Sequence, residues 1–193
     1  DFIRANKFKI IEAAKNKKEV TAKAPVVVGA DGANSVIARK AGLWKTSPKH
    51  HIVALRAYYS GVKGMKGMIE LHFLKSVLPG YFWIFPLENG LANIGIGMLL
   101  SDKNKRKTNL EQAMLEAIQK EPLFRQRFDK AKMGAPVKAW NLPLATAKRQ
   151  LVADGLMLIG DAASLIDPFT GEGIGNALVS GNIAAERIAE AHE

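Results

Sequence analysis

Two aspartates that each follow a short apolar run are the residues of this sequence best suited to bind a ligand. Asp161 comes after Leu156–Ile159 and a glycine, and Asp31 comes after Val26–Val28 and a Gly-Ala step. Apolar runs of this length predict buried strands of a parallel sheet. Open α/β sheets bind ligands at the carboxyl ends of such strands, where a carboxylate can accept hydrogen bonds from hydroxyl groups.

Three glycines at alternate positions follow Asp161 and open a predicted helix over Gly173–Glu190. They are Gly171, Gly173 and Gly175. Glycine lets a ligand approach the backbone N–H groups, and the positive end of the helix dipole favours negative charge. A carboxylate beside such a helix end suits a polyol-phosphate cofactor and points to a flavin. The alternative is a structural turn, because Gly-Asp pairs and short glycine motifs are also common in loops.

The two segments together resemble a motif pair of flavoprotein hydroxylases and their reductase relatives. GADGANSVIAR (29–39) is similar to the DG motif, and LIGDAASLIDPFTGEGIGNA (158–177) is similar to the GD motif. The resemblance implies a partial, discontinuous FAD-binding domain of the glutathione-reductase-like Rossmann type, with an α+β substrate domain inserted between the motifs. The implied ranges are 1–45 and 143–193 for the cofactor domain and 46–142 for the insert.

The same resemblance implies roles for individual residues around FAD. Asp161 would bind the ribityl chain, the N–H groups of Gly173 and Ile174 would face the pyrimidine ring or the phosphates, and Pro168 would lie against the isoalloxazine. Asp31 would help to shape the cofactor site. The implied cofactor-binding residues are Asp31, Gly32, Gly160, Asp161, Pro168, Gly171, Gly173, Ile174 and Gly175.

A second kind of pattern occurs in the segment YFWIFPLENGLANIGIG (81–97). Tyr81, Trp83 and Phe85 alternate, so a strand places the three rings on one face. Asn89-Gly90 predicts a hairpin, and in the returning strand Leu91–Leu99 two glycines lack side chains on one face. The pattern predicts either an apolar slot between the aromatic row and the bare strand, or ordinary core packing.

This hairpin resembles the corresponding motif of the geranylgeranyl reductase family, in which it lines the tunnel for the prenyl chain. The shared pattern is Tyr-x-Trp-x-Phe-Pro, eight residues, and Gly-x-Gly. The resemblance extends from about Ala24 to Ala185. The implied substrate-binding residues are Tyr81, Trp83, Phe85, Pro86, Gly95 and Gly97.

The family resemblance implies an FAD-dependent oxidoreductase that reduces carbon–carbon double bonds of a geranylgeranyl or other polyprenyl lipid. NAD(P)H or another reductant would supply the electrons. Because such an alkene is unactivated, positioning against the flavin should matter more than an acid, and we assign no catalytic residue. Two alternatives stay open: an FAD-dependent monooxygenase of the aromatic type, and a non-catalytic lipid-binding module.

The ends of the sequence depart from the family pattern. Residue 1 is an aspartate, and no Gly-x-Gly-x-x-Gly motif for the ADP half of FAD is present. The resemblance therefore predicts an internal fragment of a protein roughly twice as long. We expect that this fragment binds FAD weakly or not at all and is itself inactive.

Composition and charge narrow the classes of partner. The chain has 193 residues, no cysteine and a formal net charge of +10, and its four histidines show no ligand spacing, so no metal site is expected. The lysine clusters Lys15–Lys18 and Lys103–Lys107 predict solvated loops, or alternatively a basic face for anionic lipid headgroups or a diphosphate. Nucleic-acid binding is not expected, because no basic motif with stacking aromatics occurs.

Without a signal peptide or a long apolar segment, we expect a cytoplasmic protein with peripheral membrane contact.

The remaining pattern is typical of short strands and helices. Thr108–Lys120 should form a helix with Leu110, Met114, Leu115 and Ile118 on one face. The other predicted elements are a hairpin over Phe8–Ala14 and Val20–Ala22 with its turn at Asn16–Lys18, a helix over Val36–Gly42, strands over Ile52–Val62, Met68–Leu74 and Val137–Leu142, and a short helix from Pro122.

Overall fold

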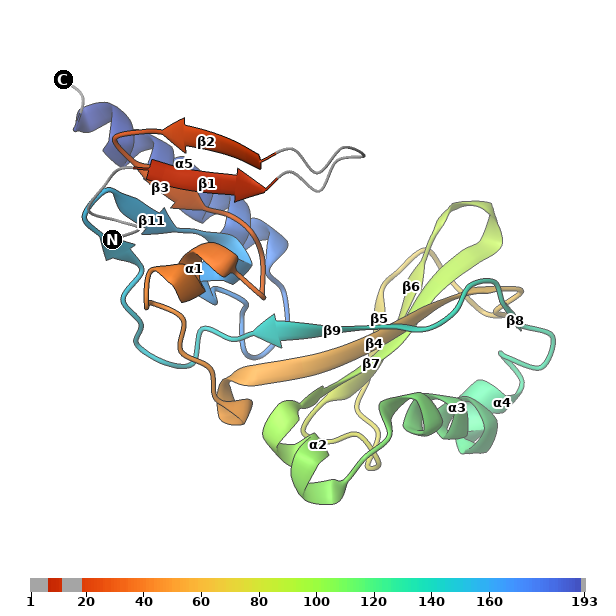
Figure 1. Cartoon of the computed structure of the whole chain (residues 1–193). Helices are drawn as coiled ribbons and strands as arrows, with labels where there is room; N and C mark the ends of the chain where they lie inside the picture. The colour runs from red at the N-terminus through yellow and green to blue at the C-terminus, as the bar shows by residue number, and fades with distance from the viewer. Residues whose placement is uncertain (1–6, 12–18, 192–193) are drawn as a thin grey trace. The chain divides into compact units, whose positions relative to one another are not determined.

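The computed structural model describes residues 7–11 and 19–191, with side chains from residue 24 onward (Figure 1). The chain divides into two compact units. The first contains residues up to Thr46 and from Pro143, and the second contains Ser47–Leu142. The predicted turn at Asn16–Lys18 and the first lysine cluster lie outside the described residues.

The first unit is built on a short parallel pair of strands from distant parts of the chain. β3 (Val27–Gly29) pairs in parallel with β11 (Leu156–Leu158), and β10 (Val152–Ala153) pairs antiparallel with the other edge of β11. A separate antiparallel pair, β1 (Lys7–Ile11) and β2 (Glu19–Lys23), forms the predicted hairpin. The parallel register places the carboxyl ends of β3 and β11 at one edge, so the turns that follow them start side by side.

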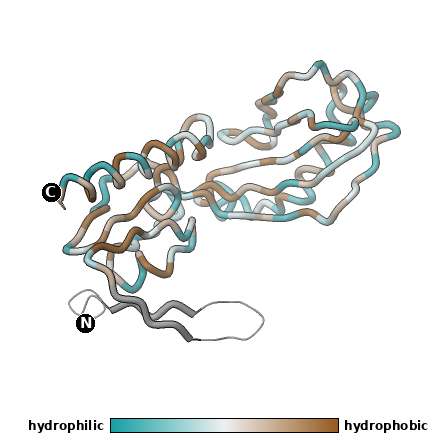
Figure 2. The backbone as a smooth tube through the Cα atoms, turned by 90° about the horizontal axis from the view of Figure 1, so that it is seen from above, coloured by the Kyte–Doolittle hydropathy of each residue, from teal (hydrophilic) through white to brown (hydrophobic). Residues whose placement is uncertain are grey.

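Two helices and one 3-10 turn complete the first unit. α1 (Val36–Lys40) follows β3, the 3-10 helix Gly160–Ala163 follows β11, and α5 (Ile174–Glu190) ends the unit. Hydrophobic and hydrophilic residues alternate along α5 in Figure 2, as expected for an amphipathic helix. The core cluster beside β11 joins buried Ala38, Leu158 and Ala163 to half-buried residues such as Ile37 and Trp44.

The second unit is an antiparallel sheet with helices on one face. The strand order is β5 (Glu70–His72), β6 (Tyr81–Pro86), β7 (Leu91–Leu99), β4 (His51–Ser60) and β8 (Lys132–Met133), and β9 (Lys138–Pro143) also pairs with β4. Asn89 and Gly90 both have positive φ, at 56° and 69°, as a tight hairpin turn between β6 and β7 requires. The mixed α/β architecture with antiparallel sheets is as the sequence predicted.

Alternation along the strands separates a packed face from an open face. Phe82 and Ile84 on β6, and Ile94 and Ile96 on β7, are fully buried. They pack with Met114 of α3 (Leu110–Lys120) and with Phe124 of α4 (Pro122–Arg125) in one core cluster. The helices that Figure 1 draws beside this sheet therefore cover the face to which even-numbered residues of β6 point.

Three sequence expectations differ from the structure. The cluster Lys103–Lys107 is not a loop: α2 (Leu100–Arg106) contains most of it, with Lys107 as its left-handed C-cap. Basic side chains suit the last turn of a helix because they face the negative end of its dipole. Leu115 is 37% exposed, and Ala117 takes a place in the core instead. The strand expected over Met68–Leu74 is only Glu70–His72.

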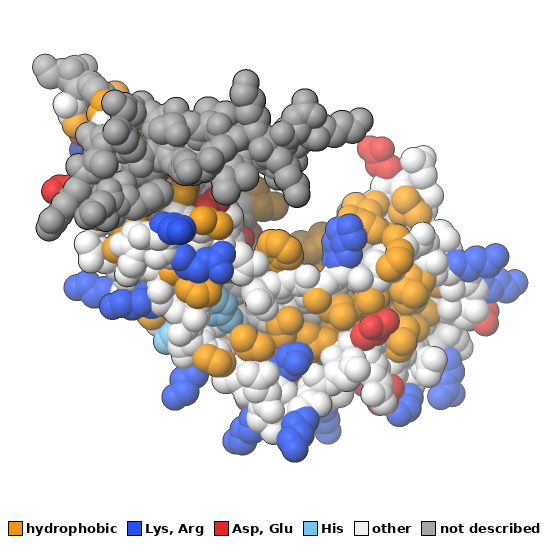
Figure 3. Space-filling model, in the orientation of Figure 1, with side chains coloured by type: hydrophobic (Ala, Val, Ile, Leu, Met, Phe, Trp, Pro, Cys, Tyr) orange, Lys and Arg blue, Asp and Glu red, His pale blue; other side chains and the backbone are white. Residues whose placement is uncertain are grey.

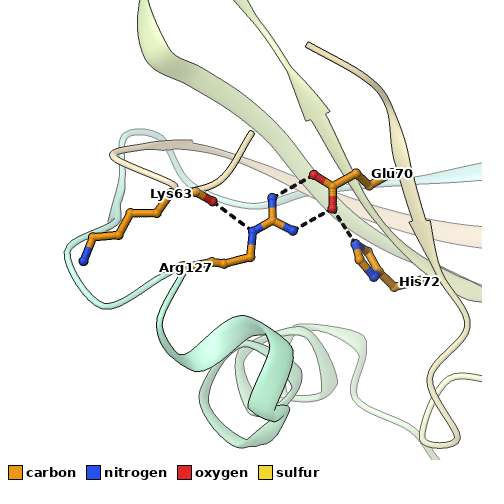
Figure 4. A network of polar contacts seen from close by, with 4 residues as sticks. All are labelled: Lys63, Glu70, His72 and Arg127. Atoms are coloured by element: carbon orange, nitrogen blue, oxygen red, sulfur yellow. Dashed lines mark hydrogen bonds and ion pairs between the residues drawn. The ribbon is translucent and has the colours of Figure 1, made fainter. Parts of the chain in front are cut away.

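A charged network ties the edge strand β5 to the end of the helical layer (Figure 4). The Arg127 guanidinium donates two hydrogen bonds to Glu70, at 2.6 and 2.7 Å, and its Nε donates to the Lys63 carbonyl at 2.9 Å. His72 lies 3.0 Å from the same carboxylate, and its ring stands edge-on to Phe124. Bidentate pairing of this kind fixes geometry as well as charge.

Glu70→Gln is expected to lower the free energy of unfolding by about 2 kcal/mol at pH 7, because it leaves a mostly buried guanidinium without its counter-charge. The hydrogen bond and charge of Arg127 hold the pKa of Glu70 below its ordinary value. This stabilisation is therefore present above the ordinary carboxyl pKa and is lost as the pH falls through the lowered one. Urea unfolding at pH 7 and through the acidic range measures both effects. Glu116→Gln, which removes an exposed pair with Lys120, is the control and should change stability much less.

Candidate functional site

Asp31, at the end of β3, uses its carboxylate to organise the start of α1. It accepts hydrogen bonds from Ser35 Oγ at 2.6 Å, from Val36 N at 2.7 Å and from Ile37 N at 3.1 Å. Burial opposes its ionisation, but these hydrogen bonds prevail and hold the pKa of the carboxyl below its ordinary value. Ser35 is the N-cap of α1 and accepts from Ala38 N. Asp31 is thus a structural acid whose hydrogen-bonding capacity is largely used by the protein.

Asp161, at the end of β11, has a different environment. Its side chain is half-buried, and no described residue donates a hydrogen bond to its carboxylate. Burial raises its pKa, because the charged form is partly removed from water without a compensating partner. A half-buried carboxylate that has no protein donor and a raised pKa is a candidate for ligand contact.

Glycines bring the turn after β11 close to α5. Gly160 has φ of +54°, and a Cβ there would lie 3.1 Å from the Ala177 Cβ. Its N–H donates to Ser180 Oγ of α5 at 3.0 Å. At Gly173, the N-cap of α5, a Cβ would lie 3.0 Å from Ile166 and 3.4 Å from Asp161 Oδ1. The absence of a side chain at Gly173 therefore lets the start of α5 pack closely against Ile166 and the Asp161 carboxylate.

Fewer backbone N–H groups are available at the start of α5 than the glycine pattern suggested. Gly175 N donates to Glu172 Oε1 at 2.7 Å, so one helix N–H already has an acidic partner. Among the described residues, no acceptor lies on the N–H groups of Gly173 and Ile174. Glu172 was not among the sequence candidates. It lies one residue before the N-cap Gly173, outside the usual capping-box position of an acid, and still accepts from a first-turn N–H.

The loop between the two glycine turns is ordered by its own hydrogen bonds. Asp167 accepts from Phe169 N, Thr170 N and Thr170 Oγ1 at 2.7 to 3.0 Å. Pro168 is exposed, and Gly171 has φ of +73°. The sequence left open a turn with a capping aspartate as the alternative. A turn does follow β11 at Gly160–Ala163, but the carboxylate that caps backbone N–H groups is that of Asp167 and not that of Asp161.

The structure gathers some of the predicted cofactor residues closely and leaves others apart. Gly160, Asp161, Gly173 and Ile174 converge where β11 meets α5. Asp31 and Gly32 follow the neighbouring strand at the same edge, and no atom would lie within 4 Å of a Cβ on Gly32. Pro168, Gly171 and Gly175 lie on the connecting loop and the first turn of α5.

In the second unit, the aromatic row lies on the open face of the sheet. Tyr81, Trp83 and Phe85 are half-buried, and neighbouring rings are 6.1 and 5.9 Å apart between centroids. Phe73, which is 61% exposed, extends the row beyond Tyr81 at 6.1 Å. These rings point away from the helix-covered core, so the core-packing alternative for them is wrong.

The two glycines of β7 do not leave an empty slot opposite these rings. Gly95 pairs with Trp83, and a Cβ on Gly95 would lie 2.0 Å from the indole ring. The indole fills this space, and Trp83 Nε1 donates to Asn93 Oδ1 at 3.2 Å. At Gly97 the nearest neighbours of a Cβ would be 3.5 and 3.8 Å away. The Trp83 indole therefore packs directly on Gly95, and Gly95 does not form one wall of a cavity.

A cation shares the open face with the aromatic row. The strand register places Arg56 opposite Gly95 and Tyr58 opposite Asn93, on the same face as Trp83. The Arg56 guanidinium lies 4.5 Å from the centre of the Tyr58 ring. The face can hold an extended apolar chain along the rings and offers one positive charge beside it. Sequence analysis missed Arg56 and Asn93, because only the register shows which face they share.

Among the described residues, no group of three or more His, Asp or Glu side chains forms a metal-binding cluster. In the same part of the chain, no helix combines the length and hydropathy needed to cross a bilayer.

Comparison with known proteins connects this geometry to a family. Residues 51–133 match the family model for the geranylgeranyl reductase catalytic domain. A digeranylgeranylglycerophospholipid reductase of Methanoculleus marisnigri is 33% identical over 85% of this chain and 40% of its own length. The enzyme of that name from Thermoplasma acidophilum is 34% identical over 92% of this chain and 44% of its own length. These matches support the geranylgeranyl reductase family. The chain spans less than half of the length of these curated relatives.

Solved structures share the fold. A geranylgeranyl bacteriochlorophyll reductase-like protein from Thermoplasma acidophilum matches 95% of this chain and 47% of its own, with a TM-score of 0.82 and 32% identity. A flavin-dependent brominase matches 92% of this chain and 46% of its own, with a TM-score of 0.76 and 24% identity, which shows a common fold alone.

Gly95→Ala is expected to lower the free energy of unfolding by about 2 kcal/mol, because the added methyl group displaces the Trp83 indole. Urea unfolding followed by tryptophan fluorescence measures this loss and the change in indole environment. Gly97→Ala is the matched control on the same strand and face, and ordinary contact distances predict little change there. Equal effects of the two substitutions would contradict the seating of Trp83 on Gly95.

Proposed function

We propose that the protein is an FAD-dependent oxidoreductase that reduces carbon–carbon double bonds of a geranylgeranyl or other polyprenyl lipid. The observation that carries the lipid part is the open face of the second unit, where four aromatic rings form one continuous row. The relatives named digeranylgeranylglycerophospholipid reductase support the same substrate class. The substrate-binding residues would be Tyr81, Trp83, Phe85, Pro86, Gly95 and Gly97, with Gly95 acting through Trp83.

The residues after β11 fit a flavin cofactor. The Asp161 carboxylate has no described donor, Gly173 places no side chain of its own beside it, and the N–H groups of Gly173 and Ile174 have no described acceptor. A carboxylate next to two free N–H groups matches hydroxyl donors and carbonyl or phosphate acceptors on one ligand. Glu172 at the same helix end disfavours a fully charged phosphate there and favours a neutral acceptor such as a pyrimidine carbonyl.

The protein's own part in the reaction is binding and orientation. Bound FAD, once reduced, would supply a hydride to one carbon of the double bond, and a proton that originates from solvent would add to the other carbon. The aromatic row would hold the isoprenoid chain by apolar contact, which fixes an unactivated alkene in place and excludes water. Burial raises the pKa of Tyr81, so its hydroxyl stays protonated at neutral pH. Its ring packs between Phe73 and Trp83, and we assign it to binding.

Each unit would then have one task. Residues 1–45 and 143–193 would contribute to the FAD-binding domain, and residues 46–142 would form the substrate domain. We place the reaction at the cytoplasmic surface of a membrane, where prenyl lipids are found, with NAD(P)H or another reductant as the electron source.

The first test removes the Asp161 carboxylate from the protein that contains this chain. Asp161→Ala should weaken FAD binding by about 10-fold to 100-fold, as expected for the loss of hydrogen bonds to a charged group. Fluorescence titration with FAD measures the affinity. Asp167→Ala is the control, because Asp167 is engaged with Phe169 and Thr170. Equal weakening by both substitutions would contradict the assignment.

The same substitution has a second readout without cofactor. Since burial raises the pKa of Asp161, its charged form destabilises the folded state, and this penalty disappears as the pH falls through the raised pKa. Asp161→Ala should therefore unfold at higher urea than the unsubstituted protein at pH 7, and the two should converge in acid. A cofactor-binding acid that lowers stability is typical of a functional site.

The second test follows the reaction itself. The protein that contains this chain is loaded with FAD, reduced without oxygen, and mixed with a geranylgeranyl lipid. Reoxidation of the flavin with a gain of two hydrogens per double bond, measured by mass spectrometry, is the expected result. An oxygen-bearing product that forms only in air would establish the monooxygenase instead. No reoxidation under either condition would favour the lipid-binding module.

Trp83→Ala links this reaction to the aromatic row. It should raise the KM for the lipid more than it lowers kcat, because uniform binding along the chain is lost. Leu123→Ala is the control, since Leu123 is a 60% exposed apolar residue on α4. An unchanged KM in Trp83→Ala would contradict the assignment of the aromatic row to the substrate site.

A further inference from the structure

An open groove lies on the second unit, away from the aromatic row. Its volume is about 710 Å³, and it runs between α2, the start of α3 and the strands β4 and β9. Val53, Leu55 and Leu110 form an apolar floor. Val53 and Leu55 pair with Met98 and Ile96, which places the floor on the helix-covered face of the sheet. The groove and the aromatic row are therefore on opposite faces.

Two lysines form one rim of this groove. Lys103 lies on α2 and Lys107 is the left-handed residue that caps its end, and no described carboxylate lies within ion-pairing distance of either. Glu111 is the one acidic residue that lines the groove. Lys105 and Arg106 add positive charge beside it, and Figure 3 shows Lys and Arg side chains along the lower edge, where Figure 1 draws α2.

The backbone at Lys107 adds a second indication. Its φ is 54°, in the left-handed region that glycine usually occupies at the end of a helix. A lysine there is strained relative to glycine, yet it places a second cation next to the groove. The helix dipole explains why basic residues suit the last turn of α2, but it does not require one at this strained position.

We propose that this groove binds the phosphate-bearing headgroup of an anionic phospholipid at a bilayer surface. The two ammonium groups complement the phosphate, and the apolar floor accommodates the carbon atoms next to it. An inorganic anion would gain nothing from Val53, Leu55 and Leu110. A nucleic acid would need stacking aromatics, and no aromatic side chain lines the groove. Figure 3 shows apolar side chains in a band across this unit, above the basic edge.

The site anchors the protein rather than presenting the reacting chain, because the aromatic row is on the other face of the sheet. This inference rests on the proposed function. It adds that an anionic membrane lipid would hold the prenyl reductase at the bilayer that contains its substrate. Binding through α2 does not itself depend on flavin or on turnover.

The test measures co-sedimentation of the purified chain with vesicles in the absence of FAD. Vesicles of phosphatidylcholine with phosphatidylglycerol should bind the protein, and vesicles of phosphatidylcholine alone should not. The double variant Lys103→Gln/Lys107→Gln should bind the anionic vesicles about 30-fold more weakly. This factor corresponds to a loss of about 1 kcal/mol of attraction to the anionic surface for each of the two lysines. The matched control is Lys66→Gln/Lys130→Gln, which removes two exposed lysines elsewhere in the same unit.

Equal loss of binding in both double variants would overturn the groove, because it would assign the attraction to diffuse charge. Absence of binding by the unsubstituted chain would overturn it as well. Complete competition by millimolar inorganic phosphate would overturn the proposal, because it would show that the groove binds a simple anion and not a lipid headgroup. Circular dichroism of the variants checks that each is folded, and Ala139→Gln, which narrows the groove without changing charge, provides a second variant that should also weaken binding.

Discussion

The parallel pairing of β3 with β11 is the constraint on which the candidate cofactor site depends. Only three residue pairs make it, yet they join segments from opposite ends of the described chain. The pairing fixes where both following turns begin and so places Asp31 and Asp161 at one edge. Gly29 permits the close fit, because a Cβ there would lie 2.7 Å from Leu158 and 3.1 Å from Ile37. A larger residue at this position would separate the strand from its neighbours and displace both turns.

The two aspartates show how similar sequence surroundings lead to different chemistry. Asp31 is followed by a helix whose first N–H groups point at it, so its charge is satisfied within four to six residues. Asp161 is followed by a single 3-10 turn and a loop whose donors bond to Asp167 instead. Asp31 therefore has donors within the protein, and Asp161 has none among the described residues. The difference arises from the length and direction of the segment that follows each strand.

Much of the fold could be predicted because its signals are local. The β6–β7 hairpin follows from alternating aromatics and an Asn-Gly turn, and its strands end where the pattern ends. The helix α2, which contains most of the cluster Lys103–Lys107, was missed because lysine-rich segments are compatible with both loops and helix ends. The space at Gly95 was misjudged for another reason: a missing side chain is visible in sequence, but the ring that fills the gap comes from the paired strand. Register, and therefore Arg56 and Asn93, required the structure.

The division of the β6–β7 sheet into two faces bears on how its specificity can change over time. Along β6, odd-numbered residues face outward and even-numbered residues hold the core, so selection for a different ligand can alter one set while the other is preserved. Trp83 is the exception. Its indole is half-exposed on the open face and packs on Gly95 on its other side, so any replacement changes the open face and the packing together. Diversification of this surface should therefore proceed around a fixed Trp83–Gly95 pair, with Tyr81 and Phe85 as the positions that vary.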